Sequence, residues 1–157
     1  MNKVPMTPQG YKKLQDELKR LKSEERPRVI QDIEEARGHG DLTENAEYDA
    51  AKERQQQIEH KMKEIEDKLA RAQIIRPEEI NSDKVVFGAR VVLTDLENDR
   101  RLVYQLVGED EADRSQGKIS ILSPLARSMI GKSIGDMFIA KLPVGEREYV
   151  VEEISFD

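Results

Sequence analysis

Two carboxylates, Asp41 and Glu44, are the side chains whose type and spacing best suit chemistry in this sequence. They lie in a short polar segment, GHGDLTEN at residues 38–45, between two stretches with helical apolar spacing. Side chains three residues apart at the start of a helix share a face, so both carboxylates can point the same way. Carboxylate oxygens suit Mg²⁺, and a water bound to Mg²⁺ can attack a phosphodiester. The pattern therefore allows metal-assisted cleavage of a nucleic acid.

The same two carboxylates also fit a purely structural role. Asp41 or Thr43 can cap the following helix, and Glu44, three residues after Asp41, completes a capping box and complements the helix dipole. Capping boxes are common at helix starts, so spacing alone favours the structural interpretation. Two exposed side chains also supply too few ligands to hold Mg²⁺ well, so a metal site here needs a second macromolecule to complete it.

Two basic side chains, Arg37 and Lys52, are expected just behind this segment, one on each helical stretch. Together they could receive a phosphate group. Ordinary surface pairing with Glu34, Asp49 or Glu53 is the alternative. The residues alone favour that alternative, because exposed ion pairs carry little information about function.

No other set of residues predicts an enzyme that works by itself. The chain has no Cys, which excludes disulfides, zinc–thiolate sites and Cys nucleophiles. His39 and His60 are far apart in sequence and on different parts of the predicted helices, so a shared metal site is not expected. The sequence contains no Ser-His-Asp arrangement, P-loop or glycine-rich dinucleotide turn.

The first helical stretch is predicted to begin at Thr7-Pro8, where Thr7 can cap and Pro8 suits the first helical position. Its apolar stripe consists of Tyr11, Leu14, Leu18 and Leu21, followed by Val29, Ile33 and Ala36. Pro27 cannot donate a helical hydrogen bond, so we expect a kink or short break near Arg26.

The second helical stretch returns after the polar segment and ends before Arg76-Pro77. Its apolar positions follow steps of three and four residues: Tyr48, Ala51, Gln55, Ile58, Met62, Ile65, Leu69 and Ala72. Each stretch has about 30 residues and therefore a length of about 45 Å at the helical rise. Because only a tight loop separates them, they predict an antiparallel coiled-coil hairpin.

From Lys84 the pattern changes to short β-branched runs separated by turns. The runs lie at residues 85–87, 90–93, 102–107, 118–122, 137–140 and 149–151. One short helix is expected at residues 125–130, after Ser123-Pro124. The sequence therefore predicts an α+β protein. Its parts are a hairpin at 1–76 with its tip near 38–45, a linker at 77–83, and a compact antiparallel β-sheet domain with one helix at 84–157.

Composition narrows the possible partners. Charged residues make up 37% of the 157-residue chain, as expected where much of it is solvated surface. Basic and acidic side chains balance over residues 1–76, so the net charge of −6 lies in the second half. That sign is wrong for a domain that binds a duplex through its phosphates. With no long apolar run and no basic-then-apolar N-terminus, we expect a cytoplasmic protein that does not enter membranes. We also expect it to be a monomer.

Two motifs give the chain a resemblance that covers nearly its full length. Residues 36–48, ARGHGDLTENAEY, resemble the N-terminal signature of the bacterial transcript cleavage factors, the GreA/GreB family. Residues 123–132, SPLARSMIGK, are similar to the second signature of that family, and residues 86–89 and 107–112 also match. The hairpin is neutral overall and so resembles the GreA subtype more closely. Two separate motifs in the right order are specific, and they favour the functional interpretation of the carboxylates.

The resemblance implies a fold and a mechanism. Family members join a coiled-coil hairpin to an FKBP-like C-terminal domain, which docks at the rim of the secondary channel of RNA polymerase. By this resemblance Asp41 and Glu44 enter the channel, share a Mg²⁺ with the polymerase and orient the water that cuts a backtracked transcript. The chain would hold no cofactor stably by itself. It would not be an enzyme, but would stimulate the polymerase's own cleavage and so rescue arrested complexes.

The resemblance also implies contacts beyond the carboxylates. Arg37 and Lys52 match the basic patch that contacts the displaced RNA 3′ segment. Lys52 stands where Arg is typical of the family. Its ammonium group is a point charge and lacks the planar guanidinium that can contact a phosphate with two donors. Ser123 and Pro124 fall in the segment associated with the polymerase contact.

Two other functions stay open at this point. One is a coiled-coil protein that occupies the polymerase channel, or binds another client, without cleavage. The other is a free metal-dependent nuclease, which the exposed and incomplete ligand set disfavours.

Overall fold

The computed structural model describes residues 2–38 and 45–157, and these residues form two compact units. Residues 11–72 make up nearly all of the first unit, whereas residues 3–10 and 73–157 make up the second. The predicted boundaries of 1–76, 77–83 and 84–157 stay a prediction, because compactness does not show which segments fold independently.

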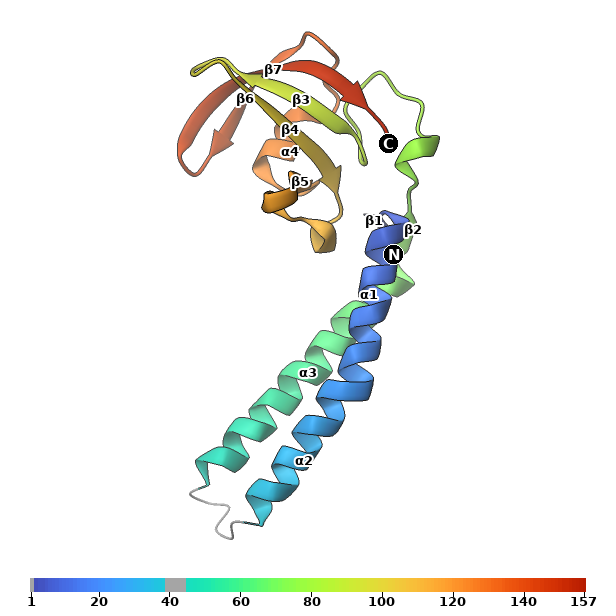
Figure 1. Cartoon of the computed structure of the whole chain (residues 1–157), viewed down its shortest axis with the longest axis vertical. Helices are drawn as coiled ribbons and strands as arrows, with labels where there is room; N and C mark the ends of the chain where they lie inside the picture. The colour runs from blue at the N-terminus through green and yellow to red at the C-terminus, as the bar shows by residue number, and fades with distance from the viewer. Residues whose placement is uncertain (1, 39–44) are drawn as a thin grey trace. The chain divides into compact units, whose positions relative to one another are not determined.

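The first unit is a helical hairpin. One arm consists of α1 (Pro8–Arg20), the π-helical segment η1 (Leu21–Glu25) and α2 (Arg26–Arg37), and the other is α3 (Ala46–Ala70). Figure 1 shows α2 and α3 lying side by side and running in opposite directions. The predicted antiparallel pair of long helices is therefore present.

The predicted apolar stripes form the contact between the arms. The buried members are Leu14, Leu21, Val29, Ile33 and Ala36 on one arm and Ala51, Ile58, Met62 and Ile65 on the other. Every one of these positions was predicted from the spacing of three and four residues, and burying them supplies most of the driving force for pairing the helices.

The predicted break near Arg26 takes the form of a π-helical turn. The Arg26 N–H donates to the carbonyl of Leu21, five residues back, instead of the usual four. Pro27 has no N–H to donate, and its ring would crowd the carbonyl four residues before it. One wider turn just before Pro27 relieves both problems, so the helix changes its hydrogen-bond pattern and then continues.

Ion pairs join the arms along their length, among them Lys22 to Glu66 at 3.8 Å, Arg26 to Glu59 at 2.9 Å, and Arg54 to Asp32. Arg26 makes the most specific of these, because its Nε and one terminal nitrogen donate to the two carboxylate oxygens of Glu59. All of these side chains keep at least a third of their surface exposed, so the pairs select the register of the arms more than they add stability.

Reversing the Arg26–Glu59 pair tests that role. Arg26→Glu or Glu59→Arg alone is expected to lower the free energy of unfolding by about 0.5–1 kcal/mol, and the double reversal should recover most of the loss. Urea unfolding of the four proteins measures the coupling, which should shrink in 1 M salt. Additive losses in the double variant would show that the two side chains do not interact.

The second unit is built on a five-stranded mixed sheet with the order β5-β4-β3-β7-β6. Its strands are β3 (Arg90–Asp95), β4 (Arg100–Val107), β5 (Lys118–Ser120), β6 (Met137–Leu142) and β7 (Gly145–Ser155). One helix, α4 (Pro124–Met129), packs against β6 (Figure 1). A separate pair joins β1 (Val4–Met6) to β2 (Ala72–Ile74), and the 3₁₀ turns are η2 (Pro77–Glu79), η3 (Glu109–Glu111) and η4 (Arg114–Gln116). The predicted α+β class is confirmed.

Two details of the predicted sheet differ from the structure. β5 pairs in parallel with β4, so the sheet is mixed and not wholly antiparallel. Residues 85–87 form no strand, although Val85 and Phe87 are buried. The Val85 N–H donates to the carbonyl of Lys132, and the Val85 carbonyl accepts from Gly131, so a loop uses the groups that a strand would have offered to a neighbour.

The first turn of α1 is anchored within the second unit. Thr7 caps the helix as predicted, because its Oγ1 accepts a hydrogen bond from the Gly10 N–H at 3.1 Å. Glu111, in η3, accepts from the Thr7 N–H at 2.9 Å and from the Thr7 hydroxyl. A carboxylate at this end of a helix also complements the helix dipole. A Cβ at Gly10 would lie 2.2 Å from Glu111 Oε1, so a larger residue at this position would displace the Glu111 carboxylate.

Candidate functional site

Asp41 and Glu44 lie outside the described residues, so their proposed catalytic and metal-binding roles stay predictions. The structure does describe the ends of the two helices that flank them. α2 ends at Arg37, and α3 begins at Ala46. The candidate site is therefore described here by the residues on both sides of this segment.

The N-cap of α3 is Asn45, and the prediction of Asp41 or Thr43 as N-cap is wrong. Asn45 has an extended backbone, and its Oδ1 accepts a hydrogen bond from the Tyr48 N–H at 3.1 Å. A capping side chain must stand directly before the first helical residue, and here that residue is Ala46. The predicted capping box with Asp41 as N-cap therefore does not apply to α3. The proposed interaction of Glu44 with the helix dipole stays a prediction.

Asn45 also contacts the other arm. Its Nδ2 donates to the carbonyl of Ala36, in the last turn of α2, at 2.6 Å. One half-buried side chain therefore bonds to both helices at the end of the hairpin. Sequence reasoning gave Asn45 no role, although an Asn just before a periodic apolar run is a strong N-cap signal.

Arg37 and Tyr48 meet across the arms. The Arg37 Cζ lies 6.0 Å from the centroid of the Tyr48 ring, within the range of a cation–π contact. Tyr48 was predicted only as a member of the apolar stripe of α3. Its half-buried ring instead faces a basic side chain, so it belongs to the candidate site as well.

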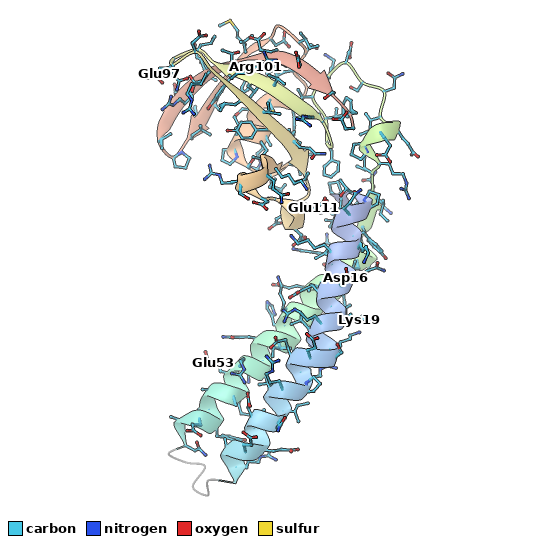
Figure 2. The ribbon with its side chains drawn as sticks, in the orientation of Figure 1. Asp16, Lys19, Glu53, Glu97, Arg101 and Glu111 are labelled. Carbon is cyan, nitrogen blue, oxygen red and sulfur yellow. The ribbon has the colours of Figure 1, made fainter. Side chains whose placement is uncertain are left out.

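Lys52 lies one turn further along α3 and is half-buried. Among residues 2–38 and 45–157, neither Arg37 nor Lys52 forms an ion pair, so the predicted surface pairing with Glu34, Asp49 or Glu53 does not occur there. Figure 2 shows Glu53 on α3. Contact of Arg37 and Lys52 with RNA stays a prediction, and the structure leaves both cations without a competing carboxylate among these residues.

Ser123 and Pro124 begin α4, close to the predicted start of that helix. The Ser123 Oγ accepts a hydrogen bond from the Ala126 N–H at 3.3 Å, and Pro124 occupies the first turn. Pro124 is exposed and Ser123 half-buried. Both residues therefore have a local role as helix start, and their contact with a polymerase stays a prediction.

Perturbed pKa values occur at structural contacts. The hydrogen bond from Arg20 lowers the pKa of Glu17 on α1, and the same bond raises the pKa of Arg20. Burial raises the pKa of Tyr149 in the sheet core, and the nearby charge of Asp95 adds to this rise. None of these three groups, Glu17, Arg20 and Tyr149, borders the polar segment at residues 38–45.

Over the described part of the chain, no group of three or more His, Asp or Glu side chains is arranged to hold a metal ion. Over the same residues, no helix combines the length and apolarity needed to cross a membrane.

Comparison with known proteins gives matches along nearly the whole chain. The family described as "Transcription elongation factor, N-terminal" matches residues 4–74, and "Transcription elongation factor, GreA/GreB, C-term" matches residues 78–156. Transcription elongation factor GreA of Syntrophotalea carbinolica is 54% identical over 153 residues, covering 98% of this chain and 97% of that protein. GreA of Alkalilimnicola ehrlichii is 53% identical over 157 residues, covering 99% of each.

Among solved structures, GreA factor homolog 1 of Thermus thermophilus is 29% identical, with a TM-score of 0.46 over 98% of this chain and 99% of that one. The two family matches together span both compact units, and the relatives match this chain over nearly their full length. The chain therefore belongs to the GreA/GreB family of transcription elongation factors.

Proposed function

We propose that this chain is a transcript cleavage factor, which stimulates RNA polymerase to cut backtracked RNA and so rescues arrested complexes. It acts in the cytoplasm as a monomer and is not an enzyme by itself. The observation that carries this proposal is the position of Asp41 and Glu44 in the chain. They fall between the end of α2 and the start of α3, where two paired helices need only a connection.

The length of the hairpin and its construction from two paired helices support a role inside a narrow channel. α3 has 25 residues and therefore spans about 38 Å at the helical rise. Its partner arm lies alongside it in an antiparallel pair (Figure 1). We propose that this hairpin enters the secondary channel of the polymerase, while the second unit docks at the rim through the Ser123-Pro124 region.

The chemistry of the donors supports a shared metal site. Asp41 and Glu44 offer hard oxygen ligands, which suit Mg²⁺, but two side chains fall short of the six positions that Mg²⁺ fills. We propose that the polymerase supplies the remaining ligands. A Mg²⁺ held in this way would supply an activated water for attack on the transcript. The two carboxylates of this chain would hold and orient that water with the metal.

Stalled elongation complexes with labelled RNA test the proposal. Adding the protein should shorten backtracked transcripts in the presence of Mg²⁺, and the protein without polymerase should leave the RNA intact. Binding without shortening would favour a non-cleaving protein that occupies the channel. Degradation of free RNA would instead show a nuclease and overturn the proposal.

The basic pair near the tip gives a further prediction. Arg37→Ala is expected to slow transcript cleavage by about tenfold, because one charge-assisted contact to phosphate is lost. Lys52→Arg should leave cleavage unchanged or increase it, since a guanidinium can contact a phosphate with two donors. Cleavage rates at several salt concentrations measure both effects. A rate for Arg37→Ala equal to that of the unaltered protein would exclude the RNA contact.

A further inference from the structure

We propose that Asn45 is a positioning residue for transcript cleavage. Its side-chain amide ties the two arms together beside the segment that carries Asp41 and Glu44, and it holds Arg37 against Tyr48. The effect on cleavage rests on the proposed function, whereas the effect on the arms follows from the contacts of Asn45 alone.

The amide of Asn45 satisfies one orphan group at each helix end. The last carbonyls of a helix and its first N–H groups have no partner within that helix. Asn45 Nδ2 donates to the Ala36 carbonyl at 2.6 Å, and Asn45 Oδ1 accepts from the Tyr48 N–H at 3.1 Å. Ala36 is only 2% exposed, so breaking this bond would leave its carbonyl with little access to water and with only the nearby Gly38 N–H as a donor.

The amide makes both contacts at once, because its donor and its acceptor are on separate atoms at the end of the side chain. The Tyr48 N–H must donate and the Ala36 carbonyl must accept, so the orientation of the Asn45 amide is fixed by its partners. Asp is as good an N-cap as Asn, but its carboxylate has no donor for Ala36. Ser also caps well, but its hydroxyl must donate and accept from one atom on a shorter side chain, which we expect to fall short of the Ala36 carbonyl. Replacing Asn45 by Asp or Ser therefore keeps the capping hydrogen bond but removes the bond to the other arm.

The bond from Asn45 to Ala36 bears directly on the candidate site. Ala36 precedes Arg37, and the Tyr48 N–H donates to the oxygen of the same amide. Arg37 and Tyr48 are then in contact across the arms, with the guanidinium carbon 6.0 Å from the ring centroid. If the arms separate, this contact is lost, and the two ends of the segment that carries the carboxylates move apart. A loss of cleavage with intact binding should result.

The effect of Asn45 on the spacing of the two arms can be tested without polymerase. The chain has no Cys, so Glu34→Cys and Ala50→Cys place two spin labels on exposed positions of α2 and α3. The distance between the labels is expected to spread over a wider range in Asn45→Asp than in the unaltered protein. Gln56→Glu is the matched control, because it adds one negative charge at an exposed position of the same helix. Equal distance distributions in Asn45→Asp and the control would overturn the proposal.

The effect of Asn45 on cleavage is tested by measuring two quantities for each variant. They are the maximum rate of cleavage and the protein concentration that gives half of that rate. Asn45→Asp is expected to lower the maximum rate by about tenfold, the scale of one lost hydrogen bond, with the half-maximal concentration unchanged within about twofold. Asn45→Ser, which adds no charge, should show the same split, and Gln56→Glu should behave like the unaltered protein. Full cleavage by both Asn45 variants would overturn the positioning role. Absence of cleavage by the unaltered protein would instead overturn the proposed function.

Discussion

Replacing both Asp41 and Glu44 by Ala is expected to abolish stimulated transcript cleavage. Even the partners that orient metal ligands contribute roughly 10- to 100-fold to metal affinity or activity, so the loss of two ligands should lower the rate by at least about a hundredfold. Asp41→Asn and Glu44→Gln keep the shape of each side chain but remove its charge, and each should cause most of that loss. Single-turnover cleavage of labelled RNA in stalled complexes measures the rates.

The double variant should still bind polymerase, because we propose that docking depends on the second unit and not on the carboxylates. It is therefore expected to compete with the unaltered protein and to slow cleavage in mixtures of the two. Raising the Mg²⁺ concentration should partly restore cleavage by the single variants, since a weakened site fills at higher metal concentration. Normal cleavage by the double variant would show that the carboxylates are not the donors.

A second large effect is expected in the core of the sheet. Leu106 on β4 is fully buried in a cluster with Ala89, Leu93 and Met129. Leu106→Ala removes buried apolar surface and leaves a cavity, so it should lower the free energy of unfolding of the second unit by about 2–5 kcal/mol. That loss is a large part of the roughly 5–15 kcal/mol that stabilises a typical domain. Urea unfolding followed by NMR signals of the strand amides separates this unit from the helices.

Leu122→Ala is the matched control for Leu106→Ala. Leu122 has the same side chain but is 53% exposed, so its truncation should change the free energy of unfolding by less than about 0.5 kcal/mol. The signals of α3 should persist in Leu106→Ala at urea concentrations that unfold the sheet. Similar losses in the two variants would contradict the burial of Leu106.

Periodicity predicted the elements of this protein well, because it depends on residues close together in the chain. The steps of three and four residues identified Ile58, Met62 and Ile65 as buried positions of one helix, and all three are buried. Most β-branched runs became strands for the same reason. Residues 85–87 are the exception, because the Val85 N–H and carbonyl bond to the loop at residues 131–132.

The candidate site was predicted in part. The motif at residues 36–48 identified the segment and the family, and family membership is confirmed by matches along both halves of the chain. Asn45 was missed because its importance depends on Ala36, a residue on the other arm. Tyr48 was assigned to the apolar stripe, since spacing does not show that a basic side chain from α2 meets its ring.

The sequence alone therefore determined the helices, most strands and the family, since local spacing and short motifs depend on near neighbours. Only the tertiary structure decided which distant groups complete each hydrogen bond. It placed Asn45 between two helix ends, Glu111 at the start of α1 and β5 in parallel with β4. A buried polar group must find a partner, and the choice of partner depends on how the whole chain packs.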